Sequence, residues 1–439
     1  MTIRKLLKSS LMSKSLIASI DQAAISGLSF LISIILIKYA PKAQFGYYSI
    51  GNAVLLFFTS VQQAIITTPL AVLLVEKKGN EKNRYAASLC YGQFVIIIPT
   101  VCLGLTATAL LAFGGFDSTK AWIAASVCFT VIGLILRQFI RSYWFAEEKP
   151  LTVFKIDVAY IVLLLCSIVV TYLFFKISVA AIFVLMGISA LIIGLFFGRT
   201  QGWRFNQGWI KKSYRENWKY GKWALSGGLV TYIQNYSYLY LLGALLGSME
   251  VAEVSASRLL ITPLILFRAG WVPIILPYGS KLREKGQIKN FFKMQVVISL
   301  LYALIVLCYC IILISLSGVL QKLIFTQEYV HSFNYLFYWA AINITGFVGL
   351  NAACGLQVAK NFEILFKVSV LCMLVTLACA FWLITTHGIK GGLLALVIGN
   401  LSGAVLLWCY YVREIFFKLA YGPKMSKKSI LIPNPQKEN

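Results

Sequence analysis

Two arginines lie inside a long apolar stretch of the sequence, residues 252–278, where a charged side chain is expensive to keep. Arg258 and Arg268 are ten residues apart, which is about 15 Å along a helix. A charge at the centre of a membrane-spanning helix costs about 2.5–3.5 kcal/mol on insertion scales. Guanidinium groups bind phosphate through two parallel hydrogen bonds. Both residues are therefore candidate receivers for an anionic group that passes through a membrane.

Carboxylates inside apolar stretches form a second set of candidates. Asp21 lies about two turns into the first apolar stretch, and Asp157 lies at the start of the fifth. Protonation of either would bias an inward-open against an outward-open state, so both are candidate coupling groups for protons or sodium. The alternative is structural, with the two carboxylates neutralising Arg258 and Arg268 as ion pairs.

Arg137 and Arg141 close the fourth apolar stretch, near its expected cytoplasmic end. Long cationic side chains near a helix end can leave their stems in apolar surroundings and extend their charge into water. We expect both arginines to snorkel in this way.

Residues 60–78, SVQQAIITTPLAVLLVEKK, place Gln62, Gln63 and Pro69 in a run that is otherwise apolar. A proline leaves a backbone carbonyl without its helical donor and permits a bend. Within a membrane this is tolerated only where protein or water takes up the freed group. The two glutamines predict either side chains that point into a polar cavity between the two bundles, beside a bendable helix, or hydrogen bonds from helix to helix.

Tyr232, Tyr236 and Tyr240 are spaced four residues apart and share one face of an expected helix, with Gln234 and Asn235 at the same level. The tyrosines straddle the helix midpoint, where their hydroxyls need partners within the protein. Rings stack on the apolar faces of sugars, and amides bond to sugar hydroxyls. These residues are a candidate sugar-binding lining, and interhelical hydrogen bonding is the alternative.

The sequence offers no ligand set for a metal or redox centre. Its ten cysteines include no C-x-x-C pair, and its two histidines, His331 and His387, are far apart. Paired carboxylates and a nucleophile with its base are missing as well. We expect no metal, no cofactor and no enzymatic activity.

The composition of the chain predicts that these residues are positioned by membrane-spanning helices. The 439 residues are 59% hydrophobic and 13% charged, with a mean hydropathy of +0.80, whereas soluble domains have roughly 25% charged residues. Crossing about 30 Å of hydrocarbon takes roughly 20 apolar residues. We expect an all-α polytopic membrane protein with about 12 spans in two six-helix bundles. The spans are expected near 15–37, 47–75, 86–112, 118–140, 156–175, 178–197, 222–248, 252–278, 292–316, 330–358, 363–386 and 388–411.

The net charge of +25 is explained by its placement along the chain. If both termini are cytoplasmic, most lysines and arginines fall on the cytoplasmic side, which is the positive-inside pattern. No nucleic-acid partner is needed. The basic connection divides the chain into an N-terminal bundle, a cytoplasmic linker, a C-terminal bundle and a basic cytoplasmic tail, at residues 1–197, 198–222, 223–411 and 412–439.

Four segments resemble one transporter family. Residues 15–50 and 62–74, the latter QQAIITTPLAVLL, resemble the first two helices of bacterial Wzx-like oligosaccharide flippases. RQFIRSYWFAEEKP (137–150) and ASRLLITPLILFRAG (256–270) are similar to the fourth and eighth helices of that family. These polysaccharide biosynthesis proteins belong to the multidrug/oligosaccharidyl-lipid/polysaccharide (MOP) exporter superfamily. The resemblance implies a MATE-like fold of two six-helix bundles around a central cavity.

The resemblance also implies a function. Family members flip undecaprenyl-pyrophosphate-linked oligosaccharide units from the inner to the outer leaflet of the bacterial cytoplasmic membrane by alternating access. The products are surface polysaccharides such as O-antigen, capsule or exopolysaccharide. Arg258 matches an arginine common at that place in the family, and cationic cavity residues of related flippases meet the pyrophosphate. Arg268 matches no known family position.

The implied partners are the lipid-linked substrate, the bilayer, a polymerase and a chain-length regulator. The alternative is a MATE-type multidrug or cation antiporter, which predicts a cavity rich in acidic groups. The buried arginines favour an anionic cargo instead.

Overall fold

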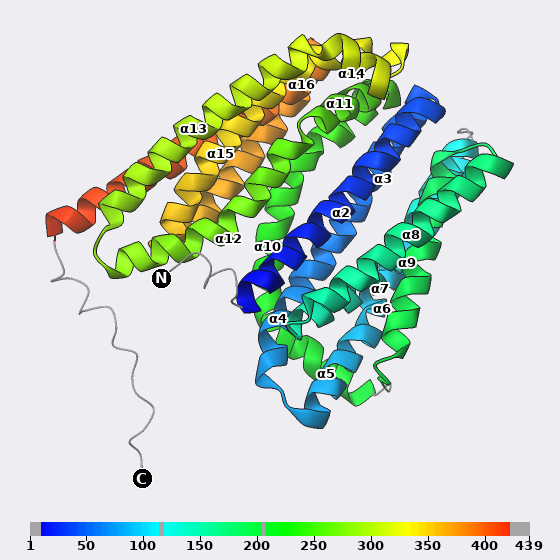
Figure 1. Ribbon diagram of the computed structural model, residues 1–439, viewed down its shortest axis with the longest axis horizontal. Helices are drawn as coiled ribbons and strands as arrows, with labels where there is room; N and C mark the ends of the chain where they lie inside the picture. Colours follow the sequence, from blue (N-terminus) through cyan, green and yellow to red (C-terminus); the bar gives the residue numbers. More distant parts are fainter. Residues whose placement is uncertain (1–9, 114–117, 204–206, 422–439) are drawn as a thin grey trace. The chain divides into compact units, whose positions relative to one another are not determined.

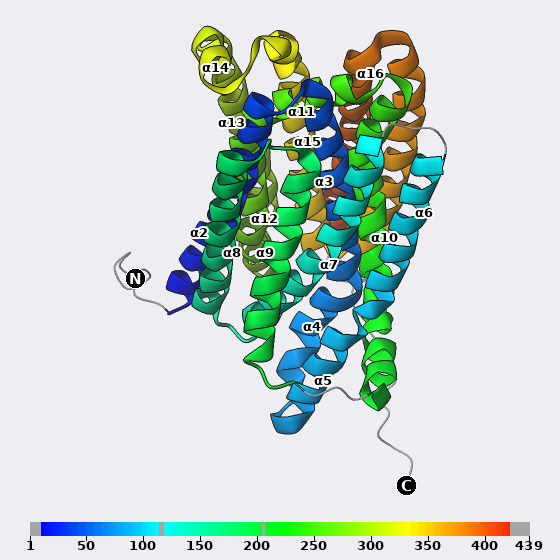
Figure 2. The same ribbon diagram turned by 90° about the vertical axis from the view of Figure 1, so that its right-hand side faces the viewer.

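The computed structural model describes residues 10–113, 118–203 and 207–421, and every regular element in these ranges is helical (Figures 1 and 2). Residues 204–206 of the predicted linker and 422–439 of the predicted tail lie outside the described residues. The main helices are α2 (Ser10–Tyr39), α3 (Lys42–Gln62), α4 (Thr68–Leu73), α5 (Gly79–Gly92), α6 (Phe94–Phe113), α7 (Ser118–Ala146), α8 (Pro150–Phe174), α9 (Val179–Arg199), α10 (Gln207–Leu245), α11 (Ser248–Leu260), α12 (Thr262–Glu284), α13 (Ile288–Ser315), α14 (Ser317–Ile324), α15 (Leu336–Val358) and α16 (Phe362–Tyr421). Short π and 3₁₀ segments complete them at Gln63–Thr67, Leu74–Glu76 and Gln327–Tyr335.

Most of these helices are membrane spans by length and composition. Within the described ranges, nine helical stretches are long and apolar enough to cross a bilayer, and α11 with α12 forms a tenth, broken span. The break falls at Ile261, two residues before Pro263. The predicted all-α, polytopic fold is thus confirmed.

The helix α16 is a hairpin that accounts for two of the predicted spans. Its apolar part, Phe362–Ile415, has 54 residues, about 80 Å if straight and far more than a bilayer needs. Gly388 breaks it at φ 59° and ψ −136°, a conformation that glycine adopts without steric cost. Gly399 lies against Thr376 and Gly403 against Cys372, so the two halves run antiparallel.

The chain divides into two compact units. The first comprises Met1–Leu259 with Ser317–Phe333, and the second comprises Leu260–Leu316 with Asn334–Asn439. The helices α10 and α11 therefore lie almost wholly in the first unit. The boundary predicted at residues 198–222 stays a sequence-based prediction.

The second span of the first unit changes its winding where the sequence predicts a bend. The helix α3 ends at Gln62, residues Gln63–Thr67 are π-helical, and α4 follows with Pro69 in its first turn. Single π turns inside α-helices are rare and occur frequently at functional sites.

A neighbouring helix takes up the backbone group that the proline leaves free. Pro69 has no N–H to donate to the carbonyl of Ile65, four residues earlier. That carbonyl accepts a hydrogen bond from Nδ2 of Asn217 on α10, at 3.3 Å. Oδ1 of Asn217 accepts in turn from the hydroxyl of Tyr85 at 2.5 Å. The bend is therefore fixed by α5 and α10.

Candidate functional site

Two arginines and two aspartates form a buried cluster in the first unit. Asp157 of α8 accepts hydrogen bonds from Nη1 of Arg137 at 2.9 Å and from Nε of Arg141 at 2.5 Å. Asp21 of α2 accepts from Nη2 of Arg141 at 2.8 Å. All four side chains are buried. Their formal charges cancel, which offsets the cost of removing each charge from water.

This cluster corrects two expectations. Arg137 and Arg141 do not snorkel, since only 6% and 8% of their surfaces are exposed. The carboxylates of Asp21 and Asp157 pair with these two arginines, so the alternative in which they neutralise Arg258 and Arg268 is wrong. The spacing of four residues places Arg137 and Arg141 one above the other on α7, facing carboxylates on α2 and α8. A coupling role for Asp21 and Asp157 stays a prediction.

A polar cavity adjoins the cluster inside the first unit. Its volume is about 220 Å³, and α2, α3, the π segment, α7, α8 and α9 contribute to its wall. Nε of Arg137, which is buried, has no hydrogen-bond partner among the described residues, and the guanidinium lies 3.7 Å from the ring centroid of Tyr160. The polar lining consists of Ser29, Asn52, Thr59, Gln63, Arg137, Gln138 and Tyr160. The cavity therefore combines one cation with amides and hydroxyls.

The two adjacent glutamines have different environments, and the helix-to-helix alternative applies to Gln62. A place for either glutamine in a cavity between the two bundles stays a prediction. Gln62 is fully buried and donates to Oε1 of Gln93 at 2.7 Å and to the carbonyl of Ile135 at 2.6 Å. Gln63 is exposed and lines the cavity. Gln62 joins helices, and Gln63 is available to a ligand.

The tyrosine face of α10 is held partly by interhelical bonding. The hydroxyl of Tyr232 bonds to the carbonyl of Ala53 on α3 at 2.8 Å and lies 2.5 Å from the hydroxyl of Tyr240. The rings of Tyr232 and Tyr236 stack with their centroids 5.0 Å apart. For Tyr232 the structural alternative therefore holds.

Gln234 and Asn235 lie beside this tyrosine face, and a hydrogen bond is described for Asn235. Asn235 is exposed and donates to the carbonyl of Thr231 in its own helix, at 2.7 Å, and Gln234 is half-buried. A sugar-binding role for Gln234, Asn235 and Tyr236 stays a prediction.

Arg258 and Arg268 are both half-buried but belong to different units. Arg258 lies in the last turn of α11, where the negative end of the helix dipole stabilises a cation. Its guanidinium carbon is 5.4 Å from the ring centroid of Tyr236. The guanidinium of Arg268 packs over Gly346 of α15, where an added Cβ would lie 2.9 Å from Nη1. A cavity wall shared by the two arginines stays a prediction.

Sequence reasoning missed a third buried carboxylate. Glu253 of α11 is 4% exposed and forms an ion pair with Lys42, the first residue of α3. Glu253 also accepts from the hydroxyl of Ser332 at 2.8 Å, and Lys42 donates to the carbonyl of Glu328 at 2.7 Å. Glu253 is the second residue of the expected span 252–278 and so is expected at a membrane surface, whereas α11 already begins at Ser248.

An amide network in the second unit was also missed. Asn351 of α15 is fully buried and accepts from Nε1 of Trp271 on α12 at 2.8 Å. It donates to the hydroxyl of Ser299 at 2.8 Å, and its backbone carbonyl accepts from Gln295 at 2.7 Å, both on α13. The available signal was an asparagine inside an apolar helix, the same signal that identified Gln62.

Solved transporters share this fold at low sequence identity. The lipid II flippase MurJ, in an inward closed conformation, matches with a TM-score of 0.71 and 14% identity, over 92% of this chain and 91% of that chain. An inward-facing multidrug resistance MATE family transporter of the MOP superfamily matches with a TM-score of 0.65 and 12% identity, over 90% and 96%. A MOP superfamily transporter from Pyrococcus furiosus matches with a TM-score of 0.56 and 12% identity, over 93% and 95%.

No protein-family model and no curated protein sequence matches the chain. Together with the apolar helices, the structural matches show a multi-pass membrane protein with the fold of MOP superfamily transporters and flippases.

Proposed function

We propose that this protein is a flippase that moves undecaprenyl-pyrophosphate-linked oligosaccharide units from the inner to the outer leaflet of the bacterial cytoplasmic membrane by alternating access. The observation that carries the proposal is the charge of the interior. Among the described residues, the buried carboxylates are Asp21, Asp157 and Glu253, and each is in an ion pair with an arginine or a lysine. The interior thus holds little negative charge with which to attract a cationic drug.

The polar cavity offers groups that suit part of such a cargo, since its volume of about 220 Å³ is smaller than an oligosaccharide unit. Nε of Arg137 is buried and has no hydrogen-bond partner among the described residues, so it would donate to a phosphate oxygen only in a state in which the cavity is open to the cargo. Gln63, Asn52 and Thr59 line the same cavity and offer amides and a hydroxyl to sugar hydroxyl groups. Arg258 and Arg268 are the further candidates for contacts with the diphosphate.

The solved transporters that share this fold support the use of interior charge to choose between an anionic and a cationic cargo. MurJ is described as a lipid II flippase and the MATE family protein as a multidrug resistance transporter, so one architecture serves different cargoes. The description of the Pyrococcus furiosus transporter states that the reverse polarity of its binding pocket suggests a different function. Here every buried carboxylate of the described residues is paired with a cation, which disfavours the cationic cargo of a MATE-type antiporter.

Transport into sealed proteoliposomes tests the proposal. A fluorescent polyprenyl-diphosphate oligosaccharide is placed in both leaflets, and an added glycosidase digests the outward-facing half. Flipping is expected to make the inner half digestible. The Arg137→Gln variant is expected to slow flipping of the diphosphate lipid more than flipping of the same lipid with an uncharged head. Efflux of cationic dyes without movement of the lipid would refute the proposal.

The energy source is tested in the same vesicles. Asp21→Asn and Asp157→Asn are assayed under imposed proton and sodium gradients. If either aspartate is a coupling group, its replacement abolishes the response to one gradient. A polymerase and a chain-length regulator are the expected partners in the cell.

A further inference from the structure

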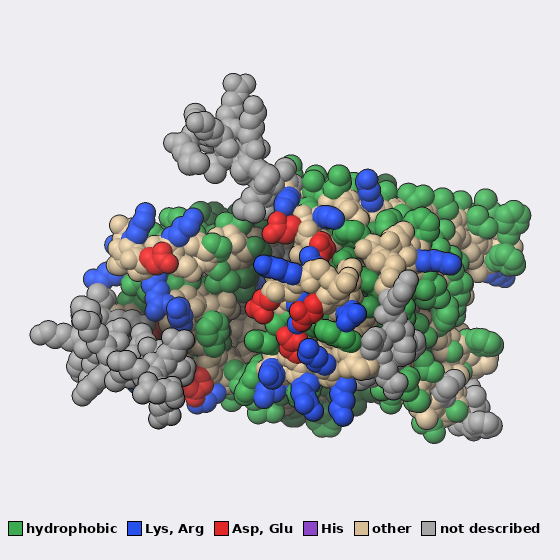
Figure 3. All heavy atoms as spheres, turned by 90° about the horizontal axis from the view of Figure 1, so that it is seen from below, with side chains coloured by type: hydrophobic (Ala, Val, Ile, Leu, Met, Phe, Trp, Pro, Cys, Tyr) green, Lys and Arg blue, Asp and Glu red, His purple; other side chains and the backbone are tan. Residues whose placement is uncertain are grey.

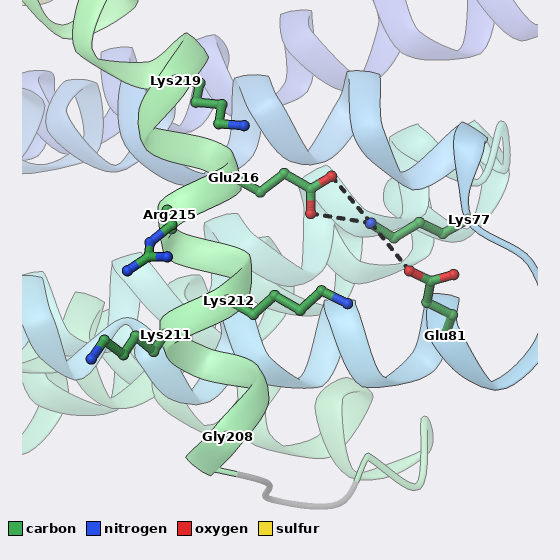
Figure 4. Close-up of a pocket in the computed structure, with 8 residues that line it drawn as sticks. All are labelled: Lys77, Glu81, Gly208, Lys211, Lys212, Arg215, Glu216 and Lys219. Atoms are coloured by element: carbon green, nitrogen blue, oxygen red, sulfur yellow. Dashed lines mark hydrogen bonds and ion pairs between the residues drawn. The ribbon is translucent and has the colours of Figure 1, made fainter. Parts of the chain in front are cut away.

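A groove lined by basic residues, named here the basic groove, runs along the first half of α10, close to the chain around the start of α5 (Figure 4). In Figure 4, Lys212 and Lys219 lie on the side of α10 that faces Lys77, and Lys211 and Arg215 lie on the other side. Its volume is about 630 Å³. Five cations line it, together with two carboxylates, so it carries a net positive charge. The cations are Lys77, Lys211, Lys212, Arg215 and Lys219. The proposed transport mechanism does not use this groove.

Lys77 is the cation of the basic groove that does not belong to α10, and it forms ion pairs with both carboxylates of the groove. Nζ of Lys77 lies 3.2 Å from Oε2 of Glu216 and 3.5 Å from Oε1 of Glu81 (Figure 4). Lys77 has only 10% of its side chain exposed and lies 4.8 Å from the ring centroid of Tyr85. It is therefore a fixed structural cation, whereas the four basic residues of α10 are exposed.

The opposite face of α10 fixes the direction in which these cations point. Ser213, Asn217 and Gly221 repeat every four residues and are buried. Ser213 bonds to the hydroxyl of Ser88 at 2.7 Å, and Asn217 bonds to Tyr85. Because this face is bonded to α5, the helix cannot rotate its cations away from the groove. The helix α10 therefore holds its basic side chains in a fixed orientation.

The groove lies next to the segment of α10 that the sequence predicts to span the membrane. The helix α10 has 39 residues, about 58 Å at 1.5 Å per residue, so only about half of it fits within 30 Å of hydrocarbon. The span is expected over residues 222–248, directly after the groove. Trp218, Tyr220 and Trp223 are 50%, 56% and 72% exposed at this junction, as in the aromatic belts at membrane–water interfaces.

Figure 3 views the first unit from the end at which α5 lies, where lysine and arginine side chains are gathered together with several acidic ones. We propose that the basic groove binds the phosphate headgroup of an anionic phospholipid in the adjoining leaflet. Basic pockets next to spanning helices are suited to such headgroups, and the exposed tryptophans place this pocket at headgroup depth. The bound lipid would fasten the basic connection between the sixth and seventh spans to the membrane surface.

Lipid retention tests the proposal on the full-length protein. The protein is reconstituted in nanodiscs of phosphatidylcholine with phosphatidylglycerol, transferred to mild detergent, and analysed by native mass spectrometry. The test variant combines Lys211→Gln, Lys212→Gln and Arg215→Gln. The matched control combines Lys281→Gln, Lys285→Gln and Lys289→Gln, which removes the same charge from exposed positions of the second unit.

The expected result is a loss of bound phosphatidylglycerol of at least about tenfold in the test variant, because each juxtamembrane cation contributes roughly fivefold to binding. The control variant should retain the lipid. Glu216→Gln, which releases Lys77 from one of its two carboxylates, should retain more lipid than the unmodified protein. Equal loss in the test and control variants would overturn the proposal.

Two further experiments show whether the phosphate that binds belongs to a phospholipid, a polyprenyl diphosphate or a free inorganic anion. Inorganic diphosphate is titrated calorimetrically against the unmodified protein and the test variant, and a polyprenyl diphosphate competes with phosphatidylglycerol in the nanodiscs. Weak binding of inorganic diphosphate and no preference for the polyprenyl lipid support a phospholipid site. Tight binding of inorganic diphosphate, or displacement of phosphatidylglycerol by a stoichiometric amount of the polyprenyl lipid, would overturn it.

Discussion

Nδ2 of Asn217 on α10 lies 3.3 Å from the carbonyl oxygen of Ile65, the group that Pro69 cannot serve. This contact ties the most irregular part of the second span to a different helix. This part of the span therefore depends on two elements. Pro69 leaves the Ile65 carbonyl without its helical donor, and Asn217 of α10 supplies another donor.

The first prediction concerns this pair. Asn217→Leu should lower the free energy of unfolding by about 1–3 kcal/mol, because it leaves the Ile65 carbonyl and the Tyr85 hydroxyl buried without their partner. Pro69→Ala restores an N–H in the bend, so Asn217→Leu should cost less in that background. Thermal unfolding of the four proteins of the cycle in one detergent measures the difference. Strictly additive effects would show that the two residues are not coupled.

The second prediction separates the adjacent glutamines. Gln62→Leu should destabilise the protein by about 1–3 kcal/mol, because Gln93 and the Ile135 carbonyl lose a buried donor. Gln63→Leu should leave the unfolding temperature unchanged and slow lipid flipping, because Gln63 lines the cavity. Unfolding and flipping are measured on the same preparations. Loss of stability in Gln63→Leu, or normal flipping at normal stability, would contradict the assignment.

The third prediction concerns the buried ion-pair cluster. Asp157→Asn removes the shared partner of Arg137 and Arg141 and should cost about 3–5 kcal/mol, the range for breaking a buried pair. Lys367→Gln is the control, since it removes an ion pair to Glu363 whose two side chains are 71% and 77% exposed, and it should leave the unfolding temperature unchanged. Similar behaviour of the two variants would show that the cluster is solvated.

The fourth prediction concerns the close approach of α3 and α11. A Cβ on Gly46 would overlap the carbonyl oxygen of Ser248, so Gly46→Ala should force the two helices apart at a cost of about 1–3 kcal/mol. Gly27→Ala is the matched control, because a Cβ at Gly27 meets no atom within 4 Å. It should be neutral or slightly stabilising. Circular dichroism melts of both variants in detergent compare them.

The fold class could be predicted from the sequence because hydropathy is a local property. A run of apolar residues spans a membrane whatever its neighbours are, and the hairpin at Gly388 matches two separately predicted spans. Even here the break between α11 and α12, two residues before Pro263, falls inside a stretch, 252–278, that the sequence predicts as one continuous span.

The partners within the site could not be predicted in the same way. Sequence identified Arg137, Arg141, Asp21 and Asp157 as costly residues but assigned the wrong role to the arginines. The ion pair of Arg141 with Asp21 joins residues separated by 120 positions, and only the packing of α2, α7 and α8 brings them together. Pairing of helices depends on shape and small residues over the whole bundle, which one sequence does not display.

The π segment at Gln63–Thr67 holds one more residue per hydrogen-bonded ring than an α-helical turn. If it rewound to α, the two ends of the span would swivel against each other by about 100°, the rotation per residue of an α-helix. The position that Gln63 now occupies at the cavity would then fall to its neighbour. That neighbour is Gln62, so a carboxamide would stay at this position, whereas Asn52 and Thr59 of α3 would turn away from the cavity wall.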